Sequence, residues 1–307
     1  METILKARGI VKKYGNRKVL DSVNMNIYKG DIYGFIGKNG AGKTTFMRAV
    51  LDLTKKDAGE VYFFDGKTIN DSGLKIGSLI ENPGLYKNVT GYENLKRYAI
   101  LYNDNNTDLM SLLDEVGLSK AAHKKVKGYS LGMKQRLGIA ISLLGDPEFL
   151  LLDEPINGLD PEGIRDIRDL IIKLNKEKGI TFLISSHLLD ELAKIVTRYG
   201  IINNGQLLEE IGAKELKDKC KHKIIVYVND KEKAKKLIGE IVPLKDIKIN
   251  SEYIEIKSNI DKASEINKKL VKAGLEVSSI YQNQDSLEEY FMRRIGDWYV
   301  KFNKTTF

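Results

Sequence analysis

The chain has 307 residues, a formal net charge of +8, 42% hydrophobic residues and 30% charged residues. This is the composition of an ordinary globular protein, which excludes a disordered chain and one embedded in a membrane. The lysines are scattered along predicted helical faces without interleaved aromatic residues, a pattern that favours a solvated surface over a nucleic-acid groove, so we expect no nucleic-acid partner. The longest apolar stretch, residues 137–152, is broken by Asp146, Pro147 and Glu148, so it falls short of the ~20 apolar residues of a spanning helix.

The first two-thirds of the chain has the pattern of an α/β domain. Its opening segment, Ile4 to Ile27, alternates apolar and polar residues around the turn at residues 14–16, which indicates antiparallel strands. Short apolar runs then alternate with amphipathic stretches up to about Leu208, which indicates a largely parallel sheet flanked by helices. The expected buried strands are residues 31–36, 150–152, 181–184 and 199–202.

A helical segment and a change of composition divide the chain further. The pattern between Gly91 and Leu144 is almost wholly helical, so we expect a helical subdomain at about residues 86–146. From about Ala213 the sequence becomes richer in lysine. We therefore expect one domain over residues 1–212 and a smaller α+β domain with a tail over residues 213–307. The predicted element order of the second part, βαββαβ followed by an amphipathic helix at 286–295, resembles a ferredoxin-like unit.

Residues 37–44, Gly-Lys-Asn-Gly-Ala-Gly-Lys-Thr, have the spacing of a phosphate-binding loop between a predicted strand and a predicted helix. Glycines let backbone amides point towards phosphates, and the helix N-terminus adds positive potential. Lys43 is expected to reach the outer phosphates, and the Thr44 hydroxyl to bind Mg²⁺. The nucleotide contacts expected in and beside this loop are Gly37, Asn39, Gly40, Ala41, Gly42, Lys43, Thr44 and Thr45.

The apolar run at residues 149–152 ends in two carboxylates, Asp153 and Glu154. A buried strand of this kind delivers its acids to the sheet edge where phosphates bind. Asp153 is predicted to hold Mg²⁺ through water, and Glu154 to accept a proton from the water that attacks the γ-phosphate. The two motifs therefore predict a nucleotide hydrolase that uses Mg²⁺, and the resemblance described next implies that the nucleotide is ATP.

Three further motifs decide the class of nucleotide hydrolase. Residues 129–136, Tyr-Ser-Leu-Gly-Met-Lys-Gln-Arg, precede the acidic strand, Asn-Gly-Leu-Asp at 157–160 follows it, and Ser-Ser-His at 185–187 follows the next strand. In this order they resemble the signature motif, the D-loop and the switch histidine of ABC ATPases. Tyr14 matches the aromatic residue on which that family stacks adenine. The resemblance covers residues 3–211.

The resemblance implies a homodimer that encloses ATP at its interface. Ser130 and the Gly132 amide, at a helix N-terminus, would bind the γ-phosphate held by the partner's loop. By the same resemblance His187 contacts the γ-phosphate at the catalytic centre beside Glu154, and Asp160 works across the interface. The family also implies a separate transmembrane permease, for which residues 83–101 are the expected docking surface.

The sequence departs from the common ABC pattern at two places. Leu131 and Met133 replace a glycine and the glutamine of the usual signature, whereas Ser130 and Gly132 are kept. Glu81 stands where most cassettes have the Q-loop glutamine, and we expect it to bind Mg²⁺ directly. With this glutamate, the signature and a closing motif at residues 285–291, the chain resembles the ATPases of bacitracin-resistance and lantibiotic-immunity exporters.

We therefore expect an ATP-hydrolysing subunit that drives the export of, or resistance to, an antimicrobial peptide. Its single cysteine, Cys220, fits a reducing cytosol, so the expected location is cytoplasmic and peripheral, at the inner face of the cell membrane. The alternatives are an ABC ATPase of another exporter, for multidrug, ion or lipid transport, and a soluble ABC protein with no transport role. A phosphate-loop GTPase is a further alternative, for which residues 175–178 lack the aspartate that would recognise guanine.

Overall fold

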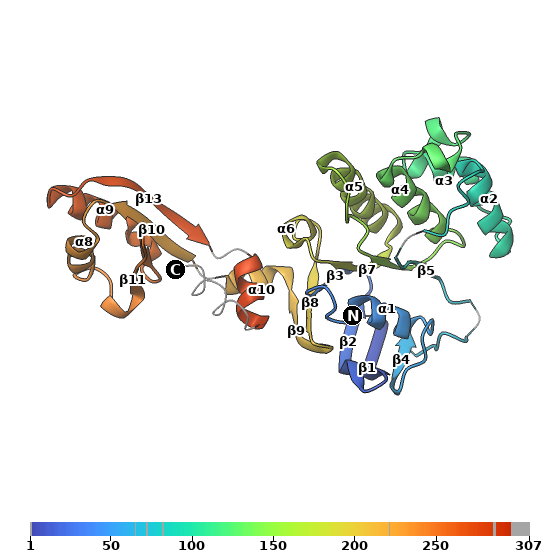
Figure 1. The fold of residues 1–307 in the computed structure, drawn as a ribbon, viewed down its shortest axis with the longest axis horizontal. Helices are drawn as coiled ribbons and strands as arrows, with labels where there is room; N and C mark the ends of the chain where they lie inside the picture. The colour runs from blue at the N-terminus through green and yellow to red at the C-terminus, as the bar shows by residue number, and fades with distance from the viewer. Residues whose placement is uncertain are drawn as a thin grey trace. The chain divides into compact units, whose positions relative to one another are not determined.

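The computed structural model describes residues 2–64, 66–71, 73–81, 83–220, 222–284 and 287–295. The chain divides into two compact units, Met1–Ala213 and Lys214–Phe307 (Figure 1). Among the described helices, none has both the length and the apolar character needed to cross a membrane. Asn82, Asp285, Ser286 and the predicted tail at residues 297–307 lie outside the described residues.

The centre of the first unit is a six-stranded sheet of order β5-β6-β7-β3-β8-β9. Its first five strands are parallel, and β9 pairs with β8 in the antiparallel direction. Every residue of β3, β6 and β7 is buried, as expected of parallel strands that are covered on both faces. The strands are β3 (Ile32–Ile36), β5 (Ile76–Leu79), β6 (Phe149–Asp153), β7 (Thr181–Ser186), β8 (Arg198–Asn203) and β9 (Gln206–Gly212).

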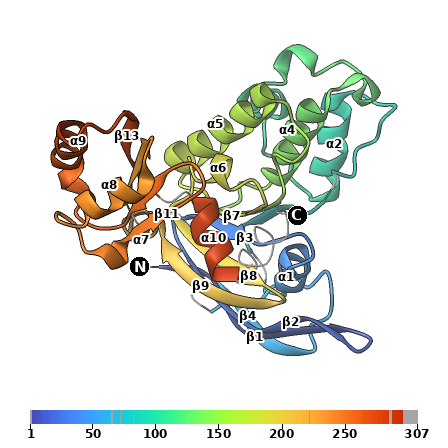
Figure 2. The same cartoon turned by 60° about the vertical axis from the view of Figure 1, so that its left-hand side comes forward.

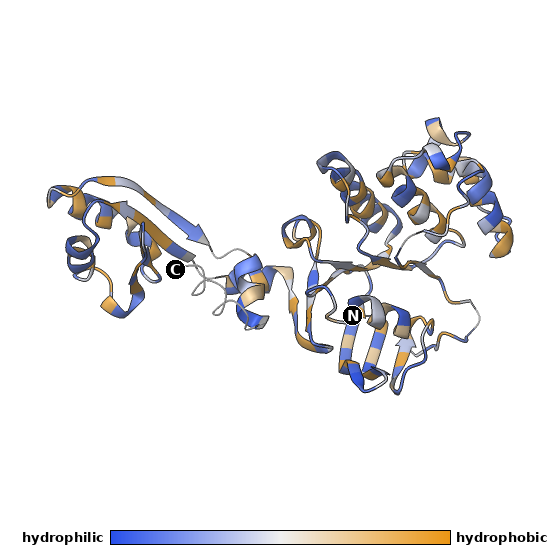
Figure 3. Cartoon of the chain, viewed as in Figure 1, coloured by the Kyte–Doolittle hydropathy of each residue, from blue (hydrophilic) through white to orange (hydrophobic). Residues whose placement is uncertain are grey.

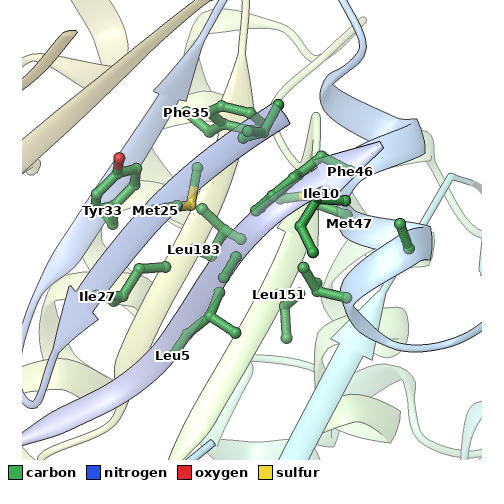
Figure 4. Packing of buried hydrophobic residues seen from close by; sticks show 14 of the residues in the cluster. Leu5, Ile10, Met25, Ile27, Tyr33, Phe35, Phe46, Met47, Leu151 and Leu183 are labelled. Atoms are coloured by element: carbon green, nitrogen blue, oxygen red, sulfur yellow. The ribbon is translucent and has the colours of Figure 1, made fainter. Parts of the chain in front are cut away.

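A second, antiparallel sheet of order β2-β1-β4 packs beside the first through one helix. The strands are β1 (Thr3–Tyr14), β2 (Arg17–Tyr28) and β4 (Ala58–Phe63), and hydrophobic residues alternate with hydrophilic ones along β1 and β2 (Figure 3). The helix is α1 (Lys43–Val50), whose Phe46 and Met47 are fully buried in a cluster with residues of both sheets (Figure 4). This cluster fixes α1, and the loop before it, against the main sheet.

Helices cover the face of the main sheet opposite to α1 (Figures 1 and 2). Those from α2 to α4 belong to the predicted helical segment, and α5 and α6 follow it in the chain. Thr90 and Glu93 make a capping box at the start of α2, and Asp108, Ser130 and Asp160 cap the helices that follow them. The elements are α2 (Gly91–Leu101), α3 (Leu109–Glu115), η1 (Ser119–Ala121), η2 (Val126–Gly128), α4 (Leu131–Ser142), α5 (Pro161–Lys178) and α6 (Leu189–Leu192).

The second unit has its own antiparallel sheet, of order β11-β12-β10-β13, and its own core, which includes Ile224, Val226, Ile266 and Leu270. The predicted βαββαβ order is confirmed by the order of its elements. The strands are β10 (His222–Val228), β11 (Ile247–Ile249), β12 (Ile254–Ile256) and β13 (Val277–Gln284). The helices are α7 (Ala213–Lys219), α8 (Lys231–Ile238), η3 (Leu244–Asp246), η4 (Ile260–Lys262), α9 (Ala263–Lys272) and α10 (Leu287–Ile295).

Candidate functional site

The loop at residues 37–42 connects β3 to α1 and has a backbone that only glycine adopts easily. Gly40 and Gly42 have φ angles of 79° and 111°, in the left-handed region. A β-carbon at position 37 would lie 2.6 Å from the Ile202 carbonyl oxygen, so this glycine permits a close approach to β8. The loop therefore stays tight against the sheet.

Lys43 is a buried cation with partners in its own loop and on Glu154. Its side chain is 6% exposed, and its Nζ donates to the Gly37 carbonyl at 2.7 Å and lies 3.4 Å from Glu154 Oε1. A buried charge needs such partners, because the loss of hydration is otherwise unfavourable. Phosphate oxygens would therefore have to replace the acceptors that now hold Lys43.

Thr44 and Asp153 meet where β6 ends beside the start of α1. The Thr44 hydroxyl donates to Asp153 Oδ2 at 2.7 Å, and the Ser185 hydroxyl donates to Asp153 Oδ1 at 2.5 Å. One carboxylate and one hydroxyl suit Mg²⁺, which usually takes its remaining ligands from waters and substrate phosphates. Within the described part of the chain, no group of three or more His, Cys, Asp or Glu side chains comes together as a metal site without such help.

Glu154 is held between Lys43 and His187. Its Oε2 lies 2.8 Å from His187 Nδ1, and its backbone N–H donates to the Ser185 hydroxyl at 2.9 Å. Glu154 has a φ of 50°, an unusual value for a residue with a side chain and one that often marks functional sites. The contacts orient both carboxylate oxygens, and the 21% exposed side chain remains accessible to water.

A cavity of about 370 Å³ opens over these residues. It collects Tyr14 from the end of β1, the loop residues and Glu154 in one place, and Lys12 Nζ lies 4.9 Å from the centre of the half-exposed Tyr14 ring. Residues that were predicted to bind nucleotide and that line the cavity are Tyr14, Asn39, Gly40, Gly42, Lys43, Thr44 and Thr45.

Sequence reasoning missed Arg17 and Val19, which line this cavity, and it gave no contact to Asn157, a third lining residue that belongs to the predicted D-loop. Arg17 pairs with Tyr14 across the hairpin of β1 and β2. The predicted turn at residues 14–16 could therefore have indicated that Arg17 lies beside Tyr14. Ser185 lies within the predicted switch motif but was given no role. Its register opposite Asp153 in neighbouring parallel strands is what brings it to the site.

The residues predicted to act across a dimer interface lie elsewhere in the single chain. The Ser130 hydroxyl accepts from the Met133 N–H at 3.2 Å, and Asp160 Oδ1 accepts from the Gly163 N–H at 3.0 Å, so each caps its own helix. Ser130, Gly132 and Asp160 do not line the cavity described above. Their predicted contact with nucleotide therefore needs a second chain.

The Glu81 carboxylate has its partner on α1. It lies 2.8 Å from Arg48 Nη2, and the Glu81 side chain is 55% exposed. Thr44 and Asp153, by contrast, are bonded to each other. Arg48 therefore holds the Glu81 carboxylate in this structure.

Comparison with known proteins places this geometry in one family. The family model described as ABC transporter matches residues 20–157. A bacitracin transport ATP-binding protein of Bacillus licheniformis is 42% identical over 301 residues, which cover 96% of this chain and 98% of that protein. The chain belongs to the ABC transporter ATP-binding proteins.

Other members of the ABC family match different shares of the chain. A lantibiotic transport ATP-binding protein of Streptococcus pyogenes is 45% identical over 208 residues, which are 67% of this chain and 90% of that protein. Among solved structures, the ADP conformation of an ABC transporter cassette is 31% identical, with a TM-score of 0.62 over 70% of this chain and 93% of that one. A dimeric post-hydrolysis cassette bound to ADP and Pi is 26% identical, with a TM-score of 0.61 over 68% of this chain and 99% of that one.

These comparisons confirm the predicted fold class and activity. The chain is an α/β phosphate-loop ABC cassette with a small C-terminal α+β unit, and it is an ATP hydrolase of the ABC transporter class. ATP is its nucleotide. ATP-binding subunits of this family work with separate permeases and dimerise.

Proposed function

We propose that this chain is the ATP-hydrolysing subunit of an exporter that removes, or confers resistance to, a bacitracin-like or lantibiotic-like antimicrobial peptide. The observation that carries the proposal is the likeness to the bacitracin transport ATP-binding protein, which extends over 98% of that protein and so is not confined to the cassette. A second bacitracin transport ATP-binding protein, from Enterococcus faecalis, is 39% identical over 300 residues.

In the proposed mechanism Lys43, Glu154, His187 and Tyr14 have separate tasks. The phosphates of ATP take over Lys43 from Glu154, and the loop amides bind the same phosphates at the N-terminus of α1. Released from Lys43, Glu154 Oε1 accepts the proton of the attacking water, while His187 keeps Oε2 in place. Tyr14 offers its half-exposed ring for stacking with the base.

Magnesium completes the proposed site. Thr44 and Asp153 would hold it, and when bound it would neutralise charge on the β- and γ-phosphates. The direct bond between Thr44 and Asp153 supports this assignment because it brings the two donors to one point beside the phosphate loop. Glu81 stays a predicted ligand, which would have to leave Arg48 to take part.

The proposed active form is a homodimer, with Ser130 and Gly132 of each chain bound to the nucleotide of the other. The support is that both lie outside the cavity of their own chain. We further propose that the dimer binds a separate permease through residues 83–101, at the cytoplasmic face of the membrane. The substitution Glu154→Gln should trap the dimer with ATP and Mg²⁺, as sedimentation would show. A variant that remained monomeric under these conditions would contradict the proposed assembly.

The transported substrate is tested in the host strain. Deletion of the gene should increase sensitivity to bacitracin or to a lantibiotic, and the wild-type gene, but not the Glu154→Gln gene, should restore resistance. Unchanged sensitivity to these peptides, together with a changed sensitivity to an unrelated drug or ion, would favour another ABC exporter. Hydrolysis by the purified protein with no effect of deletion on any transported compound would favour the soluble alternative.

A further inference from the structure

The segment between β5 and α2 is fixed at its C-terminal end by helix α2. Asn94 is fully buried: its Oδ1 accepts from the Tyr86 N–H at 2.8 Å, and its Nδ2 donates to the Tyr86 carbonyl at 3.0 Å. The Tyr98 hydroxyl donates to the Gly84 carbonyl oxygen. These contacts hold Gly84 and Tyr86 on the helical segment of the cassette.

The N-terminal end of the same segment packs against α4, the helix that Ser130 caps. A β-carbon at Gly138 would lie 2.9 Å from Pro83 Cβ and 3.1 Å from Leu79 Cδ1. Glycine at position 138 therefore allows α4 to approach both residues closely. Leu79 and Pro83 flank Glu81 on either side, so the backbone around Glu81 follows α4.

Glu81 connects this segment to α1. Its φ of 63° lies in the left-handed region, and its carboxylate reaches Arg48 Nη2 at 2.8 Å. Arg48 is the partner of Glu81 in an ion pair among the described residues. Arg48 comes one helical turn after Thr44, on the same side of α1, and side chains on a helix lean towards its N-terminus. The pair therefore lies next to the predicted magnesium ligand.

The ion pair between Arg48 and Glu81 is exposed, so another cation can readily replace Arg48. The Arg48 and Glu81 side chains are 41% and 55% exposed, and such pairs contribute little to stability because water screens them. A carboxylate bonded to a guanidinium has fewer lone pairs for a metal ion, and the guanidinium charge itself opposes a dication nearby. Arg48 thus opposes metal binding in two ways. It occupies the Glu81 carboxylate, and its own positive charge repels the metal ion whether or not Glu81 is present.

We propose that Arg48 is a positioning residue that competes with Mg²⁺ for the Glu81 carboxylate, so that the segment around Glu81 is bound to α1 before the metal arrives and released from it afterwards. This rests on the proposed function, in which Mg²⁺ enters with ATP beside Thr44. Because Gly138 and Asn94 tie the same segment to the helical part of the cassette, the exchange at Glu81 decides whether that part is also tied to α1.

The experiment measures the binding of a non-hydrolysable ATP analogue by the full-length protein as a function of Mg²⁺ concentration, without turnover. Arg48→Ala should lower the Mg²⁺ concentration for half-maximal binding by about two- to five-fold, the range that corresponds to loss of an exposed ion pair. Arg48→Gln should do the same. The matched control is Lys56→Ala, which breaks the ion pair between Lys56 and Asp52, two residues that follow the end of α1. It should leave the Mg²⁺ concentration for half-maximal binding unchanged.

A double-mutant cycle identifies the route of the effect. In a Glu81→Gln background most of the change caused by Arg48→Ala should disappear, and an undiminished change would overturn the proposal. A second result would also overturn the proposal: binding that depends on Mg²⁺ in the wild type, with the same Mg²⁺ concentration for half-maximal binding in the Arg48→Ala variant. That result would leave the proposed function intact. Wild-type binding with no dependence on Mg²⁺ would contradict the proposed function itself, and the role of Arg48 with it.

Discussion

At the scale of single residues, the catalytic centre is organised around one carboxylate with two different partners. Lys43 lies near one oxygen of Glu154, and His187 Nδ1 lies 2.8 Å from the other. The strand end and the left-handed backbone of Glu154 turn the side chain into the cavity. The two proposed tasks, phosphate binding by Lys43 and proton transfer by Glu154, therefore fall to different side chains, and substitutions can distinguish them.

Glu154→Gln should keep nucleotide affinity and reduce the hydrolysis rate by a factor on the order of 10² to 10⁴, the usual contribution of a general base. The amide has the same shape but cannot accept the proton of water. Phosphate release under saturating MgATP measures the rate. The control is Glu162→Gln, an exposed acid in the first turn of α5. If the Glu154 variant hydrolysed ATP at the wild-type rate, Glu154 would not be the base.

Lys43→Ala should weaken binding of the ATP analogue by roughly 10- to 100-fold, since a hydrogen bond to a charged group contributes about 1.5–3 kcal/mol. Equilibrium titration with a fluorescent analogue measures the loss. Lys176→Ala removes an exposed lysine near the end of α5 and should bind normally. A normal isotherm for the Lys43 variant would mean that the loop does not hold the phosphates through this side chain.

The sequence allowed much of this centre to be predicted, because the phosphate loop and the acidic strand end are continuous in the chain. Arg17 escaped prediction because its place in the cavity depends on the geometry of the hairpin, and Asn157 was recognised as part of the D-loop but not as a residue of the cavity. The partner of Glu81 was missed for a similar reason. In the sequence Arg48 has the pattern of an ordinary helix residue. Its contact with Glu81 depends on tertiary structure, in which Leu79 and Pro83 pack against α4 on either side of Glu81.

At the scale of elements, helix α4 shows two uses of glycine. Gly132, in its first turn, has ordinary space around it, whereas Gly138 faces Leu79 and Pro83 with no room for a side chain. Glycine in a helix is unfavourable relative to alanine, so a retained glycine needs a reason. At position 138 that reason is contact with the segment around Glu81.

Gly138→Ala should destabilise the first unit by about 1–3 kcal/mol, the usual cost of forcing extra atoms into a packed site. Gly132→Ala is the matched control in the same helix and should be neutral or stabilising by up to about 1 kcal/mol. The midpoint of the first unit's unfolding transition in urea measures both. Equal midpoints for the two variants would mean that α4 does not need the close approach at Gly138.

The buried strands were predictable because their residues form short apolar runs, and β3, β6, β7 and β8 occur where these runs are. Strand β5 was not predicted. Its Gly77 and Ser78 break the apolar pattern, and a β-carbon at Gly77 would lie 1.9 Å from the Ser142 carbonyl oxygen. This strand exists because α4 and β6 pack against it, which is information outside its own four residues.

At the scale of the whole molecule, the chain consists of two units with separate hydrophobic cores. The lantibiotic transport relative is matched over 90% of its length by only 67% of this chain. A cassette of this family therefore exists without a counterpart to about a third of the present chain. We expect the two units to unfold as separate cooperative transitions, because each buries its own apolar surface.

A saturating ATP analogue with Mg²⁺ should raise the midpoint of the first unit's thermal transition and leave that of the second unit in place. At a ligand concentration of about 100 times Kd the stabilisation is about 2.7 kcal/mol, which corresponds to roughly 5–10 °C for a unit of this size. Differential scanning calorimetry resolves the transitions, and at the same ligand concentration Lys43→Ala should reduce the shift to half or less, because the ligand is then only about 1 to 10 times the Kd of the variant. One transition that moves as a whole would mean that the units unfold together.

The contact of Lys43 with Glu154 also has a consequence for selectivity among anions. An incoming anion meets a lysine whose charge is already balanced, so it must offer more than a single negative group to replace the carboxylate. A triphosphate can offer one group to Lys43 and others to the loop amides and the start of α1 at the same time, whereas a single phosphate must share its oxygens among them. An anion with several phosphate groups is therefore favoured over a single phosphate in the competition with Glu154 for Lys43.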